Sequence, residues 1–445
     1  MKLAIHNEVA VSNDEVRQLD RAYVFHSWSM QGNLNPLVIA GAQGCELWDY
    51  EGNTWLDFSS QLVNVNIGYQ HPRVLAAMKA QLETLVTIAP ATANLARGEA
   101  AKRIVDLAPA GFSKVFFTNA GADANENAIR MARLYTGRDK ALSAYRSYHG
   151  NTGSAIAATG DWRRVPNEFS RGHVHFFNPY LYRSEFNAAT EEEECQRALA
   201  HLRRIIECEG PTAIAAILLE SIPGTAGILV PPAGYMQGVR ALANEFGIVL
   251  ILDEVMAGFG RTGSWFAFEQ DGAVPDLVTF AKGVNAGYVP AGGVLISEPI
   301  ARYFDDHFFA GGLTYSGHPL AMAAIVATID AMKEEKVVEN AASIGNEVLR
   351  PGLEALAEKH AIIGEVRGRG LFQALELVSS REQKTPLTAA DMAAIKGALT
   401  EAGLLAFVVE NRIHVVPPCT ITAEQVAQGL AIFDAVFARF ASLAK

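Results

Sequence analysis

The chain has few cysteines, no run of basic residues and no apolar run long enough to cross a bilayer. Its four cysteines, Cys45, Cys195, Cys208 and Cys419, are widely spaced and form no CxxC pair, which argues against structural zinc and favours a reducing compartment. The missing basic runs and the net charge of −11 argue against nucleic acid as a partner. Residues 1–14 lack the apolar core of a signal peptide, so we expect a cytoplasmic protein without a membrane partner.

Internal repeats and low-complexity stretches are also missing. At 445 residues the chain is too long for one hydrophobic core, and its 50% hydrophobic and 19% charged residues are typical of a globular protein. From Pro72 onward helical and apolar segments alternate, which indicates an α/β domain. After about residue 330, helical segments surround short strands such as 370–377 and 412–416, which indicates a smaller α+β domain.

We therefore predict a large domain over residues 59–330, a small C-terminal domain over 331–445, and an N-terminal segment, 1–58, that joins the small domain. Local signals predict a helix over 12–27 capped at Ser12 or Asn13, strands over 45–50 and 55–58, a loop over 60–69, and a helix start in the acidic run 191–194.

Two short apolar segments carry the chemistry. Residues 248–252 end on Asp253 and Glu254, and residues 277–281 end on Lys282; both segments have the pattern of buried strands in a parallel sheet. In such sheets functional side chains gather at the carboxyl ends of the strands. A lone lysine is usually a surface charge, but this position favours a buried one. An acid that can pair a pyridinium nitrogen and a lysine that can form an imine are the minimum equipment for pyridoxal phosphate chemistry.

Two further motifs suit such a cofactor. In residues 115–130 a strand leads through a turn at Gly121 into a helix, and free N–H groups at a helix start bind phosphate. A plain strand-to-helix turn is the commoner use of this pattern. In residues 145–152, Tyr148 lies beside a glycine and could stack on a flat ring, although most aromatic residues serve packing.

A competing motif is the GxGxxG pattern of residues 258–263, which could bind a dinucleotide after a strand. Three features argue against this use. Asp253 and Glu254 intervene and would place negative charge near the phosphates, residues 264–268 do not resemble a helix start, and Asp276 precedes its strand instead of ending it.

Taken together, these motifs resemble the signature of class III aminotransferases, which are pyridoxal-phosphate enzymes of the aspartate aminotransferase fold, fold type I. The resemblance covers nearly the whole chain and is carried by residues 48–52, 118–130, 148–150, Glu220, 253–255, 258–263, 280–283 and 312–319. Residues 287–290 and 314–319 make it most similar to the ω-amino acid:pyruvate group, which includes amine and taurine transaminases. It implies an α/β fold with a mainly parallel sheet in the large, cofactor-binding domain.

The resemblance also implies roles for individual residues. Lys282 would form the imine with the cofactor and then act as the base, and Asp253 would pair with the pyridine N–H. The expected cofactor-binding residues are Gly121, Ala122, Tyr148, His149, Glu220, Asp253, Val255, Lys282 and, from the neighbouring subunit, Thr314. For Glu220 a purely structural role is equally open. The expected substrate contacts are Trp28, Leu62, Val63, Tyr148, Phe407 and Arg412.

The sequence departs from the family pattern at several positions. Ala120 and Ala122 stand where many members have serine, and Met256 stands where aminobutyrate enzymes have a glutamine. Thr225 and Phe407 fall where related enzymes place a glutamate and its partner arginine. The usual partner of the substrate carboxylate is therefore missing.

Arg412 and Arg163 are the candidates to replace that partner, because a buried unpaired carboxylate is costly. Each could instead form a surface ion pair. We expect Arg412 to bind the acid.

On these grounds we expect the transfer of an amino group from a primary ω-amine or ω-amino acid to a small keto acid, pyruvate, by a homodimer or a dimer of dimers. A lyase or racemase on the same scaffold would use Lys282 and Asp253 in the same way, and a non-enzymatic binding protein would need neither residue.

Overall fold

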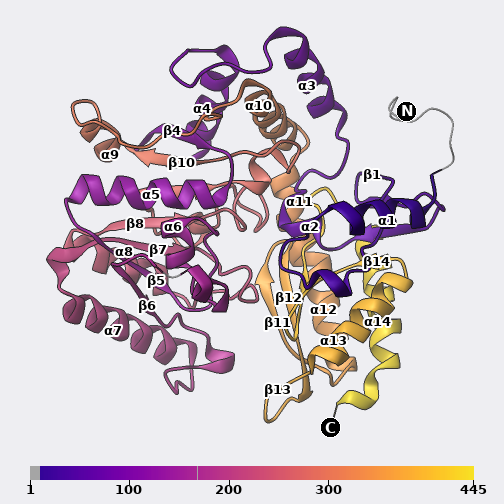
Figure 1. The fold of residues 1–445 in the computed structure, drawn as a ribbon. Helices are drawn as coiled ribbons and strands as arrows, with labels where there is room; N and C mark the ends of the chain where they lie inside the picture. The colour runs from indigo at the N-terminus through magenta and orange to yellow at the C-terminus, as the bar shows by residue number, and fades with distance from the viewer. Residues whose placement is uncertain (1–10, 168, 445) are drawn as a thin grey trace.

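The computed structural model describes residues 11–167 and 169–444 (Figure 1). The expectation that the chain lacks a signal peptide falls largely on residues 1–10, which lie outside the described residues. Within the described ranges, no helix combines the length and apolar character needed to cross a membrane.

A seven-stranded sheet forms the centre of the large domain. Its strands, in spatial order, are β4 (Phe112–Thr118), β10 (Gly292–Ser297), β9 (Leu277–Phe280), β8 (Val249–Asp253), β7 (Ile214–Glu220), β5 (Lys140–Ala144) and β6 (His173–Phe176). β10 is antiparallel to both of its neighbours, and the pairs from β9 to β6 are parallel. The two apolar segments predicted as buried strands are β8 and β9, and they are adjacent. The prediction of a mainly parallel sheet is confirmed.

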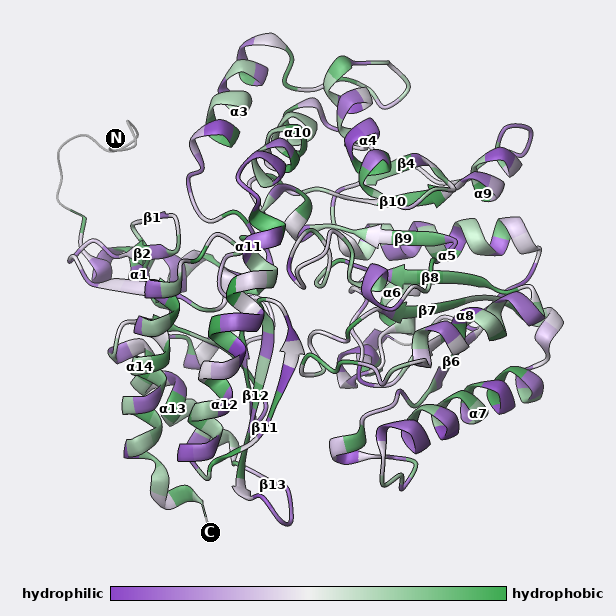
Figure 2. Cartoon of the chain, turned by 180° about the vertical axis from the view of Figure 1, so that it is seen from behind, coloured by the Kyte–Doolittle hydropathy of each residue, from purple (hydrophilic) through white to green (hydrophobic). Residues whose placement is uncertain are grey.

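Alternate residues of these strands face two separate layers, because successive side chains of a strand point to opposite faces. On β8, Val249 and Ile251 pack in a cluster with α5 (Gly121–Thr136), whereas Leu250 and Leu252 pack in a cluster with α7 (Glu191–Glu209) and α8 (Tyr235–Phe246). Figure 2 shows the resulting hydrophobic strands between the helices. The sheet is thus buried on both faces, and its strand ends remain for the chemistry.

The small domain contains an antiparallel sheet in the order β11 (Ile363–Arg369), β12 (Phe372–Ser380), β16 (Arg412–Val415), β15 (Phe407–Val409), with β13 (Thr385–Pro386) paired to β12. α12 (Arg350–Lys359), α13 (Ala389–Glu401) and α14 (Ala423–Arg439) lie beside it in Figure 1.

The N-terminal segment pairs with the C-terminal part of the chain. A four-stranded sheet has the order β1 (Gly41–Gln43), β2 (Glu46–Trp48), β3 (Thr54–Asp57), β14 (Leu404–Leu405), in which β3 and β14 are parallel. This pairing supports the expectation that residues 1–58 join the small domain, and the domain boundaries themselves stay a prediction.

The remaining elements are α1 (Asn13–Tyr23), α2 (Ser60–Val63), α3 (Pro72–Thr84), α4 (Leu95–Leu107), α6 (Gly153–Ala158), α9 (Glu298–Tyr303), α10 (Pro319–Glu334) and α11 (Val337–Ser343), the 3-10 helices η1 (Gln31–Asn33), η2 (Trp162–Asn167), η3 (Leu181–Arg183), η4 (Pro211–Ala213), η5 (Ala267–Gln270), η6 (Lys282–Asn285) and η8 (Ala441–Leu443), and a π-helical turn, η7 (Ile344–Leu349).

Several local predictions are confirmed and two need correction. Ser12 caps α1 in a capping box, and Thr190 caps α7 directly before its acidic first turn. The helix predicted over 12–27 ends at Tyr23, because Val24 is extended. The segment predicted as a loop over 60–69 starts with the short helix α2, which contains strongly non-helical residues.

Candidate active site

The carboxylate of Asp253 lies at the carboxyl end of β8 and is 3% exposed. Its Oδ2 accepts hydrogen bonds from Asn125 Nδ2 at 2.7 Å and from His149 Nδ1 at 2.8 Å, and its Oδ1 accepts from the Val255 N–H at 3.0 Å. A buried charge needs such donors, because water no longer solvates it. Three segments of the chain are therefore fixed around one carboxylate.

Asn125 is a site residue that the sequence reasoning missed. Its Oδ1 accepts a hydrogen bond of 2.7 Å from the Thr279 hydroxyl of β9, so both ends of its amide are engaged. The available signal was its spacing: Asn125 follows Gly121 by four residues, which places both on one face of α5. A polar side chain there must be paired, because that face of α5 packs against the sheet.

Lys282 follows β9 and begins η6 with a left-handed φ of 45°. Its side chain lines the main cavity. Burial lowers the pKa of Lys282, while the carboxylates of Asp253 and Glu220 oppose this shift. A lysine with a lowered pKa is more often neutral, which is the form that can act as a nucleophile or base.

The N-terminus of α5 offers an anion site. The first N–H groups of a helix have no partner within the helix, and the side chain of the N-cap residue, Ala120, has no oxygen to accept from them. A Cβ on Gly121 would lie 2.9 Å from both methyl groups of Val255, so only glycine allows this close packing. Val255, Gly121 and the Asp253 carboxylate thus form one compact unit.

The loop that carries Tyr148 is held by Glu220 at the end of β7. Glu220 Oε1 accepts from the Tyr148 N–H at 3.1 Å and Oε2 accepts from the Gly224 N–H at 2.7 Å. Burial raises the pKa of Glu220, and the nearby His149 opposes this effect. The Tyr148 ring lies against Arg163, whose Cζ is 3.9 Å from the ring centroid. Both Glu220 oxygens are therefore engaged in fixing loops, which favours a positioning role.

Lys282, Tyr148 and Arg163 border a cavity of about 850 Å³. The cavity is lined by Trp28, Leu62, Arg146, Ser147, Tyr148, Asp161, Trp162, Arg163, Tyr180, Arg183, Thr225, Ala226, Met256, Lys282, Glu376, Pro386 and residues 407–412. Five of the six predicted substrate residues are among them. The sixth, Val63, is 1% exposed and packs beneath the wall in a cluster with Met256 and Phe407. Thr314 lies in an exposed turn and is not among the lining residues.

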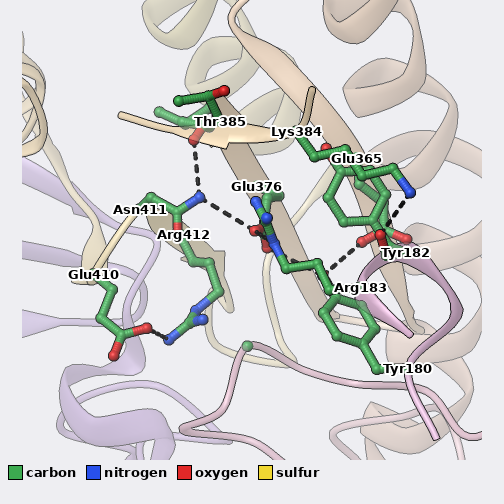
Figure 3. Close-up of polar contacts among 12 residues, drawn as sticks. Tyr180, Tyr182, Arg183, Glu365, Glu376, Lys384, Thr385, Glu410, Asn411 and Arg412 are labelled. Atoms are coloured by element: carbon green, nitrogen blue, oxygen red, sulfur yellow. Dashed lines mark hydrogen bonds and ion pairs between the residues drawn. The ribbon is translucent and has the colours of Figure 1, made fainter. Parts of the chain in front are cut away.

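One wall of the cavity is a charged network that the sequence reasoning did not find (Figure 3). Glu376 on β12 is 1% exposed and accepts from Arg183 Nε and Arg367 Nη2, each at 2.9 Å, and from Asn411 Nδ2 at 3.2 Å. Beside it, Arg412 pairs with Glu410. The signal was a single acid in the largely apolar strand 370–377, which is unusual for a buried position.

Comparison with known proteins decides the family. The model of the family "Aminotransferase class-III" matches residues 29–437. The chain belongs to the class-III aminotransferase family. It is 33% identical over 406 residues to a taurine–pyruvate aminotransferase of Bilophila wadsworthia, a match that covers 88% of each chain.

Two solved structures extend this likeness. One is a taurine:2-oxoglutarate aminotransferase from Bifidobacterium kashiwanohense in complex with PLP and glutamate, which has 43% identity and a TM-score of 0.94 and covers 97% of this chain and 99% of the other. Another is an (S)-enantioselective ω-transaminase from Thermomicrobium roseum, with 34% identity, a TM-score of 0.92 and coverage of 97% and 99%. The predicted fold type I, the aminotransferase class and the cofactor pyridoxal phosphate are confirmed.

The residues present fit this cofactor. His149 Nε2 is buried and, within the described residues, has no hydrogen-bond partner. Asn125 ties the acid to the helix with the free N-terminus, and the lysine follows the adjacent strand, so the chain brings together partners for a ring nitrogen, a phosphate and an aldehyde. The dinucleotide interpretation of residues 258–263 does not apply, because this run continues into turns and the short helix η5.

Replacing Asp253 by asparagine tests its role as the partner of the ring nitrogen. Asp253→Asn removes the charge that would keep the pyridine nitrogen protonated, and one pKa unit corresponds to about 1.4 kcal/mol. We expect the variant to bind pyridoxal phosphate but to transaminate about a hundredfold more slowly or worse, which corresponds to about 2.7 kcal/mol in the barrier. Steady-state kinetics and cofactor absorbance measure both effects. Turnover close to that of the wild type would rule out the role.

Replacing Lys282 by alanine tests the covalent attachment. Lys282→Ala should fold and retain pyridoxal phosphate through the helix terminus and ring contacts, because these do not involve the lysine. Treatment with borohydride followed by mass spectrometry should find no cofactor fixed to the protein, and turnover should be almost abolished. If borohydride still fixes the cofactor to this variant, another residue forms the link.

Proposed function

We propose that the enzyme takes the amino group of an ω-amino acid with an acidic group, such as taurine, and passes it to a small keto acid, pyruvate. The observation that carries this proposal is the cavity, which has Lys282 as one lining residue and Arg412 as another. The taurine–pyruvate relative supports both substrates. A substrate with a primary amine and an acid could then reach both residues within one pocket.

A second acceptor, 2-oxoglutarate, is favoured by one observation. The taurine:2-oxoglutarate aminotransferase is 43% identical to this chain and was solved with glutamate. Arg163 and Arg183 also line the cavity, so a second carboxylate has further arginines in reach of the same space. Pyruvate is our first choice of acceptor, and 2-oxoglutarate is the alternative.

The chain's own residues would divide the work as follows. When bound, pyridoxal phosphate supplies an aldehyde for the amino group and a ring that withdraws electrons from the reacting carbon. Lys282 Nζ would move the proton on that carbon, and burial helps by lowering the pKa of Lys282. Asp253 would hold the ring N–H. The remaining contacts would come from Val255 and Tyr148 on the ring and from the N–H groups of Gly121 and Ala122 on the phosphate.

Arg412 is a better candidate than Arg163 for binding the substrate acid. Arg163 is engaged with Asp161 through Nε at 3.0 Å and 3.1 Å and through Nη2, and it also stacks on Tyr148. Arg412 pairs with Glu410, whose side chain is 66% exposed, and an exposed ion pair is weak. The buried Nε of Arg412 has no hydrogen-bond partner among the described residues. An anion in the cavity could therefore replace the exposed Glu410 as the partner of Arg412.

We propose a homodimer, with a dimer of dimers as the alternative, located in the cytoplasm. Thr314 lies in an exposed turn and Tyr315 beside it is 61% exposed, which suits a surface that a second subunit covers. From the resemblance to the family, Thr314 would contact the phosphate of the neighbouring subunit. The cysteine usage supports a reducing compartment.

A product assay tests the function. The holoenzyme is incubated with taurine and either pyruvate or 2-oxoglutarate, and alanine or glutamate is measured. Alanine formation that needs both taurine and pyruvate supports the first choice, and glutamate alone would assign the second acceptor. Loss of the amine without either amino acid would contradict transamination of this donor.

Replacing Arg412 by alanine tests the docking of the acid. Arg412→Ala should raise the KM for pyruvate about tenfold, which corresponds to about 1.4 kcal/mol, and spare the half-reaction with uncharged amines. Arg369→Ala is the matched control, because Arg369, the last residue of β11, forms an ion pair with Asp271 and does not line the cavity. If the KM for pyruvate does not move in a folded Arg412→Ala protein, Arg412 is structural and Arg163 is the next residue to test.

The dimer is tested by sedimentation at the concentration of the activity assay. An isologous interface of an obligate dimer is large and apolar, so the protein should sediment as a dimer or a larger even assembly. An active monomer would contradict a site completed by the neighbouring Thr314.

A further inference from the structure

Arg261, in the glycine-rich run 258–263, is completely buried. In the described part of the chain its guanidinium donates to neutral acceptors: the carbonyl oxygens of Leu371 and Pro417, the hydroxyl of Ser60 at 3.1 Å and Oδ1 of Asn66 at 3.0 Å. Burying a cation whose direct hydrogen-bond acceptors are all neutral is costly. This arginine therefore needs an explanation that the cofactor contacts do not provide.

The segment that Arg261 contacts is strained. Ser60, Gln61 and Val63 have φ values of 44°, 61° and 58°, and Gln61 combines its φ with a ψ of −102°. Residues other than glycine rarely adopt such conformations, and they persist only where surrounding contacts hold them. Strained backbone of this kind is often found at functional sites.

Ser60 is the point at which the strain is held. Its hydroxyl donates to the Val416 carbonyl oxygen at 2.7 Å and accepts from Arg261 Nη2 at 3.1 Å. Asn66, at the other end of the segment, accepts from the same guanidinium and donates to the Phe259 carbonyl oxygen at 2.8 Å. Both ends of residues 60–66 are thus tied to one buried cation.

This arrangement determines which side chain faces the cavity. Leu62 is 45% exposed and lines the cavity together with Lys282, while Val63 is turned beneath the wall. Asn66 also packs on the turn that follows the lysine, because a Cβ on Gly283 would lie 2.3 Å from Asn66 Nδ2. The contacts of Arg261 therefore reach the pocket wall and the turn beyond Lys282.

We propose that Arg261 is a positioning residue that, through Ser60, holds the strained segment 60–63 so that Leu62 narrows the cavity and favours small amines. The inference rests on the aminotransferase activity and does not depend on Arg412 or on which acid is docked. It assigns a function to the glycine-rich run, which lies outside the lining of the cavity.

A double-mutant cycle between Ser60 and Leu62 tests this. Ser60→Ala removes the hydroxyl that holds the segment but does not make its strained backbone conformation easier to adopt. The segment should therefore relax, and Leu62 should move out of the cavity wall. The amine half-reactions with taurine and with benzylamine are followed by cofactor absorbance. We expect the ratio of kcat/KM for taurine to that for benzylamine to fall about tenfold in Ser60→Ala and in Leu62→Ala, with little further change in the double variant, because coupled residues are not additive.

Asn340→Ala is the matched control. Asn340 Nδ2 holds the segment that contains Cys419 and Ile421 by donating hydrogen bonds to the carbonyl oxygens of both residues. Asn340 does not line the cavity. It should lower the melting temperature and leave the substrate ratio unchanged. If Arg261→Lys folds, its ratio of kcat/KM for taurine to that for benzylamine should match the ratio of Ser60→Ala. If Arg261→Lys does not fold, Ser60→Ala alone tests the proposal.

Additive effects of Ser60→Ala and Leu62→Ala, or an unchanged ratio in a folded Ser60→Ala protein, would overturn the proposal. The failure of the proposed donor is distinguishable, because it appears as inactivity of the wild type with taurine. In that case the cycle is measured with benzylamine alone, and non-additive changes in its kcat/KM carry the same conclusion.

Discussion

The buried carboxylate of Asp253 accepts hydrogen bonds from Asn125, His149 and the Val255 N–H. Because a charge in the interior must be compensated, these donors cannot move away without a large cost in free energy. They belong to the helix with the free N-terminus, to the loop of Tyr148 and to the residue that packs on Gly121. One acid at the end of β8 therefore fixes the relative positions of the anion site, the loop of Tyr148 and Val255.

The neighbouring strands extend this constraint. Glu220 ends β7 and fixes the Tyr148 and Gly224 N–H groups, and Lys282 follows β9. Parallel strands end at the same edge, so three charged residues from distant parts of the sequence meet there. Burial raises the pKa of Glu220 and lowers that of Lys282, and both shifts reduce the number of charges that must be buried.

The charged wall of the cavity follows a different principle. Arg183, Arg367 and Glu376 form a paired network, whereas Arg412 has only the exposed Glu410 as its carboxylate partner in the described residues. The strained turn at Ser60 contributes a hydrophobic wall that limits the width of the same cavity. The cofactor side of the pocket is thus fixed by buried hydrogen bonds, and the substrate side combines a buried ion-pair network with one weakly held cation and a strained segment.

The sequence by itself determined the parallel sheet, the acid and lysine at its strand ends and the cofactor, because short apolar runs and the residues that end them are local signals. It did not predict Asn125 or Glu376 as site residues, because their hydrogen-bond partners lie up to 193 residues away in the sequence. It also did not predict the position of Val63, because the direction of a strained turn depends on contacts made only in the folded chain. The sequence also did not predict the burial of Arg261, which it shows only as one residue of a glycine-rich loop. Only the tertiary structure surrounds it with acceptors from Ser60, Asn66, Leu371 and Pro417, since burial decides which polar groups must find a partner.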